Sequence, residues 1–458
     1  MKSLRIACTG AAPVHVLKWA SGVAAAVMVA AAPLSPAYAA PAPIAAAPAP
    51  QPARLGVWDF YRSRADAPLW LAPSSGDAAK DLVALLKSAE IDGLSPDRYG
   101  VAALDKAIGD AWGGNIKAKQ RADIMLSQAF TAYVADLRQD PGVGITYVDP
   151  QLKPQAPSPM TILSEAASAP SLDQYVKAMG WMHPIYGELR EAIADHKYAD
   201  DHERDTLAVN LERARALPAT KGKYIIVNAA QQRLYMYDDR KPVDSMVVVV
   251  GQQKWPTPML SAYVRYAALN PYWYVPSDLA WEDVGQWVKK YGQSYFDRMG
   301  YEQVSDWSDN PQILDPTKID WDAVRDGTSK IYLRQKPGPQ NFMGRMKFMF
   351  PNQFGVYLHD NPRRELFEKQ VRYYSGGCVR LEDAARLGKW LFGHDLDWQS
   401  AGTEQPVMLQ QPVPVYITYL TAMPEDGGTI AYYKDEYGRD TEQMATQSAK
   451  DGDTAVGR

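Results

Sequence analysis

The chain has 458 residues and a formal net charge of −4, from 49 basic and 53 acidic side chains. A length of this order accommodates two or three domains. The mild acidity provides no basic surface on the scale that nucleic-acid binding requires, so we expect no nucleic-acid partner.

The N-terminus has the pattern of a secretory signal peptide. Three basic residues precede or flank an apolar run at 19–32, and an Ala-Tyr-Ala triplet follows at 37–39. The apolar run is shorter than the roughly 20 residues that a membrane-spanning helix needs. We predict a cleaved signal peptide over 1–39, a Pro/Ala-rich linker over 40–54 and an exported chain with no transmembrane segment.

The chain holds two cysteines, Cys8 and Cys378. Cys8 would leave with the signal peptide, so the mature protein would have a single thiol. In an oxidising compartment an idle free thiol is a liability. Cys378 is therefore expected either to be buried and inert or to take part in chemistry.

Residues 55–217 are expected to form a helical scaffold domain, because apolar residues recur there at helical spacing. The positions that mark the apolar faces are Leu82, Val83, Leu85 and Leu86, then Ile124, Leu126, Phe130, Tyr133, Val134 and Leu137, then Leu207, Leu211 and Leu217. His183, His196 and His202 lack metal-ligand spacing, so we predict that they face solvent and bind no metal.

After Pro218 the pattern changes to short β-branched and aromatic runs separated by turns, which predicts a mostly antiparallel β domain over 218–435 and an α+β fold class. The runs lie at 224–227, 234–237, 245–250, 263–269, 330–333, 346–350, 355–359 and 414–420. Residues 277–327 interrupt them and are rich in Trp and Tyr. We interpret this insertion as a cap that grips substrate, with a small separate core as the alternative. Residues 436–458 are polar and are expected to be disordered.

The strand 355–359 ends in a histidine. Because side chains alternate along a strand, Val356 and Leu358 belong to the core, and Tyr357 and His359 point to the other face. His359 is therefore expected at a strand end, facing a cleft or solvent.

A thiol follows a glycine turn in the segment 375–381. Gly376 and Gly377 let the backbone turn tightly and approach a ligand closely. Val379 and Leu381 would face inward, which leaves Cys378 and Arg380 on the outer side.

These two segments together carry the parts of an acyl-transfer site. An imidazole can take the proton of a nearby thiol and so produce the reactive thiolate. The N–H groups of Gly377 and Cys378 can stabilise a tetrahedral oxyanion, and Arg380 can hold a substrate carboxylate. We predict Cys378 as nucleophile and His359 as base; the alternative is a buried structural cysteine with Arg380 in an ordinary salt bridge.

His359 followed by Ser375-Gly-Gly-Cys-Val-Arg380 resembles the signature of the L,D-transpeptidases with the YkuD catalytic domain. Further segments resemble the large periplasmic, YcbB-like branch of that family: Asp59–Tyr61, Pro68–Trp70, Asn210–Arg213, Pro256–Pro258, Asn270–Pro276, Lys347–Asn352 and Leu358–Pro362. The resemblance covers roughly residues 55–435.

The resemblance implies a chemistry and a set of roles. The Cys378 thiolate would attack a donor stem peptide of peptidoglycan and release D-alanine, and an acceptor stem amine would resolve the thioester into a 3→3 cross-link. The matching positions are Cys378 as nucleophile, His359 as base, Gly377 and Cys378 as oxyanion turn, and Ser375, Gly376, Arg380 and Tyr357 as substrate-pocket residues. Carbapenem-type β-lactams would acylate Cys378. No cofactor or metal is implied, and the expected compartment is the periplasm.

The sequence departs from the family at two points. Gly376 stands where the commonest signature has a histidine, and residues 150–217 are too short for the peptidoglycan-binding domain of many large members. The resemblance also implies that the base is oriented by a backbone carbonyl, so Asp360 is not assumed to be a triad acid.

Several alternatives share part of this pattern. A YkuD-type carboxypeptidase or endopeptidase would use the same residues, with water as the acceptor. Papain-like and NlpC/P60-type peptidases place Cys before His in the chain, and sortases carry their arginine on a separate strand. A non-catalytic wall-binding protein would not need Cys378.

Overall fold

The computed structural model describes residues 56–277, 279–308 and 310–446. The predicted signal peptide, the whole of the predicted linker and residues 447–458 of the predicted tail lie outside these ranges. Within them, no helix combines the length and the apolar character that a membrane crossing requires.

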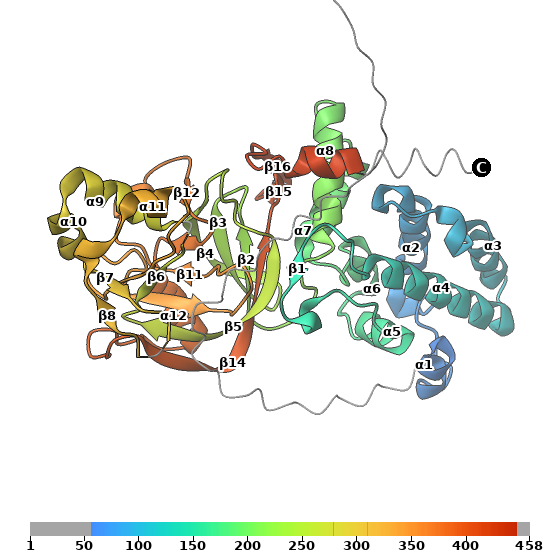
Figure 1. Cartoon of the computed structure of the whole chain (residues 1–458). Coiled ribbons are helices and arrows are strands. Elements are labelled where there is room, and N and C mark those ends of the chain that lie inside the picture. The colour runs from blue at the N-terminus through green and yellow to red at the C-terminus, as the bar shows by residue number, and fades with distance from the viewer. Residues whose placement is uncertain (1–55, 278, 309, 447–458) are drawn as a thin grey trace, which may run out of the picture. The chain divides into compact units, whose positions relative to one another are not determined.

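The N-terminal part of the described chain is helical, as predicted (Figure 1). Its helices are α1 (Val57–Ser63), α2 (Ala78–Lys87), α3 (Val101–Trp112), α4 (Ile116–Leu137), α5 (Pro159–Ala167), α6 (Leu172–Lys177), α7 (Pro184–Ala194) and α8 (Asp201–Ala214). The predicted apolar faces are buried, with Leu82, Leu126 and Leu207 each 0% exposed. A short strand, β1 (Thr146–Tyr147), leaves this region and pairs with β5 (Leu260–Leu269) of the β-rich region.

A buried carboxylate ties the start of the chain to α4. Asp123 accepts hydrogen bonds from the backbone N–H groups of Leu69, Trp70 and Leu71, at 2.7–2.8 Å. Because several N–H groups satisfy one ionised group, its burial is compensated. The Pro68–Trp70 segment is held against α4 in this way.

The prediction that His183 faces solvent is wrong. His183 is 1% exposed and is the N-cap of α7, where its Nδ1 accepts from the backbone N–H of Ile185. Its Nε2 therefore carries the proton and lies 3.1 Å from the hydroxyl of Tyr224 on β2 (Tyr224–Asn228). Burial lowers the pKa of His183 to about 3, so it is a neutral contact between the helical and β-rich regions.

The β-rich region is organised around a sheet that closes on itself. The remaining strands of this sheet are β3 (Arg233–Asp238), β4 (Lys241–Gly251), β10 (Met346–Met349), β11 (Leu358–His359), β12 (Tyr373–Ser375), β13 (Val379–Leu381) and β14 (Gln405–Thr418). The order β5-β10-β11-β13-β4-β3-β2-β14 returns to its start because β14 also pairs with β5. Most neighbours are antiparallel, as predicted, but four of the described pairs are parallel: β11 with β13, β2 with β14, β1 with β5, and β12 with β4. Apolar side chains such as Val248, Phe348 and Leu358 fill the interior.

One helix follows the last catalytic-signature strand. α12 (Ala384–Phe392) begins after Asp383, whose carboxylate accepts from the N–H of Arg386, and it buries Leu387 and Leu391. It packs on β10 and β14 and so supports the sheet behind the site.

The aromatic-rich insertion has a core of its own. Its elements are β6 (Trp273–Val275), a π-helical turn (Ala280–Gly285), α9 (Gln286–Tyr291), α10 (Gln293–Arg298), β7 (Tyr301–Val304), β8 (Ile313–Leu314), α11 (Trp321–Arg325) and β9 (Tyr332–Gln335). The strands form a separate sheet in the order β6-β9-β7-β8. The apolar cluster reaches from Trp273 to Met343, beyond the predicted bounds of 277–327. We call residues 273–343 the cap.

The chain ends, within the described ranges, in a hairpin and a helix. β15 (Ala422–Glu425) pairs with β16 (Thr429–Tyr432), and residues 439–446 are helical. Asp440 is 6% exposed and pairs with Arg213 on α8. The prediction of disorder from residue 436 is therefore wrong for 436–446, because buried polar contacts hold this stretch in place.

Candidate active site

The two predicted catalytic segments are neighbours in the sheet. β11 and β13 run parallel with His359 opposite Arg380 and Leu358 opposite Val379, and the N–H of Val379 donates to the carbonyl of Tyr357 at 3.0 Å. Adjacent strands lie about 4.8 Å apart, and aligned residues project to the same face. This register places His359 and Arg380 on one face of the sheet, and Leu358 and Val379, both 0% exposed, on the other. Tyr357 and Cys378 immediately precede the two strands, and continued alternation would bring them to the face of His359 and Arg380.

The sulfur of Cys378 lies at a strand entry surrounded by backbone groups. Its Sγ is 3.6 Å from the carbonyl oxygen of Gly355, to which the thiol donates, and Cys378 is partly exposed. Burial raises the pKa of the thiol above its usual value, while the Tyr357 N–H and the charges of Arg380 and Lys347 act against that rise. The thiol is therefore the resting form, and a base is needed to make the thiolate.

The imidazole of His359 is held by the backbone. Its Nδ1 lies 2.6 Å from the carbonyl oxygen of Asp360. A carbonyl can only accept, so Nδ1 carries the proton and Nε2 keeps its lone pair. His359 is 1% exposed, and burial, followed by the nearby charge of Arg380, lowers its pKa to about 3. The ring is thus neutral and has a defined tautomer.

The carboxylate of Asp360 points away from that ring. It accepts from the backbone N–H of Arg345 at 2.9 Å and pairs with Arg364 at 3.3 Å. Asp360 therefore orients His359 through its backbone carbonyl, as the family resemblance implied, while its side chain holds the neighbouring loop.

Two cations flank the histidine. Lys347 on β10 is aligned with His359 and pairs with Glu404 at 2.8 Å, and it lies 5.9 Å from the ring centre of Tyr357. Arg380 lies on the other side, with the charge of Asp283 from the cap nearby. In the described chain the Nε of Arg380 is buried without a hydrogen-bond partner. Because Glu404 compensates the charge of Lys347, Arg380, whose Nε has no partner among the described residues, is the better candidate of the two to bind a carboxylate.

The glycine turn is closed by Ser375. The Ser375 hydroxyl donates to the carbonyl of Cys378 and accepts from the N–H of Gly377 at 3.2 Å, and the residue is 1% exposed. Ser375 therefore lies beneath the turn and does not line a pocket. Because the Gly377 N–H is occupied, the Cys378 N–H is the better oxyanion donor of the two. Gly377 has φ +108°, a conformation that requires glycine.

Comparison with known families identifies both halves of the described chain. Residues 222–415 match the YkuD family, described as the L,D-transpeptidase catalytic domain, and residues 56–193 match a family described as a scaffold domain. The chain therefore carries an L,D-transpeptidase catalytic domain and a scaffold domain.

A curated relative supports the same assignment. The chain is 26% identical over 396 residues to a Haemophilus influenzae protein named "Putative L,D-transpeptidase", covering 83% of this chain and 77% of the relative.

Three solved structures resemble part of the chain. The first is the Ldtfm–avibactam carbamoyl enzyme, at 12% identity over 44% of this chain and 51% of that chain, with a TM-score of 0.20. The second is an L,D-transpeptidase from Mycobacterium smegmatis, at 12% identity over 43% of this chain and 58% of that chain, with a TM-score of 0.20. The third is the catalytic domain from E. faecium L,D-transpeptidase, at 14% identity over 43% of this chain and 98% of that chain, with a TM-score of 0.19. The match spans little more than half the length of the first two.

The departure at Gly376 has a structural counterpart in the cap of this catalytic domain. A Cβ built on Gly376 would lie 3.0 Å from Cδ1 of Leu279, and the three nearest atoms all belong to that leucine. The space into which a side chain at 376 would project is therefore taken by the cap.

Three groups that contact the turn of Cys378 were not predicted from the sequence. They are the carbonyl of Gly355, the N–H of Tyr357 and the hydroxyl of Thr257, which donates to the carbonyl of Gly377 at 2.8 Å. The first two are backbone groups with no sequence signal. Thr257 lay in a segment noted only for its family resemblance. Across the described ranges, no three His, Cys, Asp or Glu side chains are gathered as a metal ion would need.

Proposed function

We propose that this protein is a peptidoglycan L,D-transpeptidase that forms 3→3 cross-links through a thioester on Cys378, with His359 as base. The support comes from the catalytic domain assigned to residues 222–415 and from the β11–β13 register, which brings the imidazole and Arg380 to one face, with the thiol immediately before β13. That register is the observation on which the proposal depends.

The first half-reaction forms the thioester. As Sγ of Cys378 attacks the carbonyl carbon of the donor's L-to-D amide, its proton passes to Nε2 of His359. A C–S bond forms and the carbonyl π electrons move to oxygen, where the Cys378 N–H stabilises them. Collapse of this intermediate breaks the C–N bond. The leaving amine of D-alanine takes the proton from His359 and departs.

The second half-reaction transfers the acyl group to an acceptor. A side-chain amine of a second stem attacks the thioester carbonyl and gives a proton to His359. Collapse breaks the C–S bond, and the sulfur recovers that proton. The neutral imidazole, with its fixed Nδ1–H, serves both halves because Nε2 begins each one unprotonated.

The charged neighbours fit the substrate. Stem peptides carry free carboxylates, and Arg380, with a buried Nε that has no partner in the described chain, offers a bidentate site beside the thiol. Tyr357 extends the same face. We further propose that the chain is exported to the periplasm through the signal peptide at 1–39, because that is where such stems are found.

Incubation of the purified protein with disaccharide-tetrapeptides tests this function. We expect cross-linked dimers and free D-alanine by mass spectrometry, and no product from Cys378→Ala. Shortened monomers without dimers would instead identify an L,D-carboxypeptidase or endopeptidase, in which water resolves the thioester. Intact tetrapeptides after incubation with the wild-type protein would refute both.

A further inference from the structure

Thr257 connects a buried loop to the turn that bears the nucleophile. Its side chain is 0% exposed, and its hydroxyl accepts from the N–H of Gly251 and donates to the carbonyl of Gly377, both at 2.8 Å. The hydroxyl therefore uses both of its hydrogen-bonding roles. The loop packs closely against the backbone of Gly251, where an added Cβ would lie 2.1 Å from the carbonyl oxygen of Trp255.

The bond to Gly377 determines where the next N–H points. In a trans peptide the carbonyl of one residue and the N–H of the next are directed oppositely. With the Gly377 carbonyl held by Thr257, the Cys378 N–H points in the opposite direction within the peptide plane. Ser375 already occupies the Gly377 N–H, so the Cys378 N–H is the donor whose direction matters for an oxyanion.

Tyr437, from the C-terminal segment, holds the same loop. Its hydroxyl donates to the carbonyl of Gly251 at 2.6 Å and accepts from the N–H of Thr257 at 3.4 Å, while Arg439 donates to the carbonyl of Thr257 at 2.8 Å. The ring of Tyr437 stacks on Tyr419 at 5.1 Å between centroids. Tyr419, Tyr437 and Arg439 lie beyond residue 415, where the match to the catalytic family ends.

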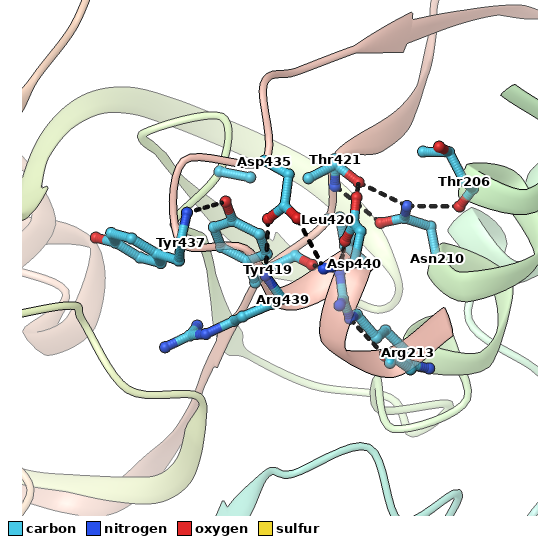
Figure 2. A network of polar contacts seen from close by, with 12 residues as sticks. Thr206, Asn210, Arg213, Tyr419, Leu420, Thr421, Asp435, Tyr437, Arg439 and Asp440 are labelled. Atoms are coloured by element: carbon cyan, nitrogen blue, oxygen red, sulfur yellow. Dashed lines mark hydrogen bonds and ion pairs between the residues drawn. The ribbon is translucent and has the colours of Figure 1, made fainter. Parts of the chain in front are cut away.

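The segment is itself anchored to the scaffold helix α8. Figure 2 shows Asp435 at the start of the last helix, where its carboxylate accepts from the N–H groups of Arg439 and Asp440. Asp440 pairs with Arg213, and Thr421 exchanges hydrogen bonds with Asn210 at 2.8 Å. A continuous set of polar contacts thus runs from α8 to the turn of Cys378.

We propose that Thr257 is a positioning residue that sets the Gly377–Cys378 peptide for oxyanion stabilisation, and that Tyr437 of the C-terminal segment holds Thr257 in place. The proposal rests on the proposed function, since it concerns the oxyanion of that acyl transfer. It predicts a defect confined to reactions of Cys378 that pass through an oxyanion.

Two reactions of the same thiol separate this role from a general effect on folding. Acylation by a carbapenem opens a β-lactam: the thiol proton passes to His359, a C–S bond forms and the carbonyl π electrons move to oxygen. When these electrons return, the ring C–N bond breaks and the ring nitrogen takes the proton from His359. Alkylation by iodoacetamide displaces iodide from carbon and develops no oxyanion. In the full-length protein, both rates at Cys378 are followed by mass spectrometry.

Thr257→Val removes the hydroxyl and keeps the shape, and we expect acylation at least tenfold slower with alkylation within about twofold of wild type. Thr257→Ser restores the hydroxyl and is expected within threefold of wild type in both reactions. Tyr437→Phe keeps the stacked ring and should slow acylation three- to tenfold. The matched control is Tyr433→Phe, a substitution four residues before Tyr437. It removes a hydroxyl that accepts a hydrogen bond from Gln231, and it should change neither rate.

If the wild-type protein is acylated, two results for Thr257→Val would overturn the positioning role. One is an equal decrease in the rates of acylation and alkylation, and the other is an unchanged rate of acylation. If Thr257→Val does not fold, Tyr437→Phe decides in the same way against Tyr433→Phe. A wild-type protein that is alkylated at Cys378 but never acylated would remove the proposed function and this inference together.

Discussion

His359 donates its Nδ1–H to the backbone carbonyl of Asp360 across 2.6 Å, and the carboxylate of Asp360 is turned to the N–H of Arg345 instead. The proposed base is therefore oriented by a peptide group and not by an acid. A carbonyl fixes the tautomer as a carboxylate would, but it adds no negative charge that would stabilise an imidazolium.

Substitution of His359 and Asp360 should have very different effects. We expect His359→Ala to slow carbapenem acylation of Cys378 by about 10²–10⁴-fold, because a positioned acid–base group is lost. Asp360→Asn keeps the backbone carbonyl and an acceptor oxygen for Arg345, so its rate should stay within about threefold of wild type. Stopped-flow measurement of acylation compares them. A loss in Asp360→Asn as large as in His359→Ala would show that the carboxylate belongs to the catalytic unit.

The pH dependence of acylation follows from the buried histidine. The pKa of His359 is lowered to about 3, so the neutral, reactive ring persists as the pH falls from 8 to 5. A histidine with the usual pKa near 6.5 would lose about thirtyfold of its neutral form by pH 5. We therefore expect a nearly flat acylation rate over this range, measured under conditions where circular dichroism shows the fold intact. A steady tenfold or greater decrease towards pH 5 would contradict the neutral-base description.

The ion pair between Arg213 and Asp440 should be important for stability. Both side chains are buried, at 1% and 6% exposure, so removing one partner strands the other charge. We expect Arg213→Met to lower the free energy of unfolding by roughly 3–5 kcal/mol in denaturant titrations. Lys80→Met, which breaks the exposed pair with Asp77, is the control and should cost no more than about 1 kcal/mol. Equal effects of the two substitutions would mean that the buried pair adds nothing special.

Local pattern predicted much of the site and little of what surrounds it. Alternation along 355–359 correctly placed Val356 and Leu358 in the apolar core, but His359 on the other face is buried as well, at 1% exposure, and does not face solvent. Alternation carried no information on which strand lies next, so the parallel pairing of β11 with β13 came only from the structure.

The errors share a physical cause. His183 lacked ligand spacing, yet this says nothing of burial, and its ring became a helix cap against Tyr224. The segment after 436 is polar in composition, but Asp440 forms a buried ion pair with Arg213, which is distant in the sequence. Thr257 contacts Gly377 in the same long-range way. Polar side chains that are satisfied by distant partners have no periodic signature, so a sequence pattern predicts them poorly.

The contact between the cap and the turn offers a last prediction. Because Leu279 occupies the space beside Gly376, Gly376→His should force the leucine aside and cost roughly 1–3 kcal/mol of unfolding free energy. Leu279→Ala opens that space and itself lowers the free energy of unfolding, because it removes packing in the cap core. In the double variant the loss of unfolding free energy should be smaller than the sum of the two single losses by about 1 kcal/mol or more. Val288→Ala, another buried cap position at 7% exposure, is the matched control and should combine additively with Gly376→His. If Gly376→His combines additively with Leu279→Ala too, the cap does not contact this turn in solution, and Leu279 does not require a glycine at position 376.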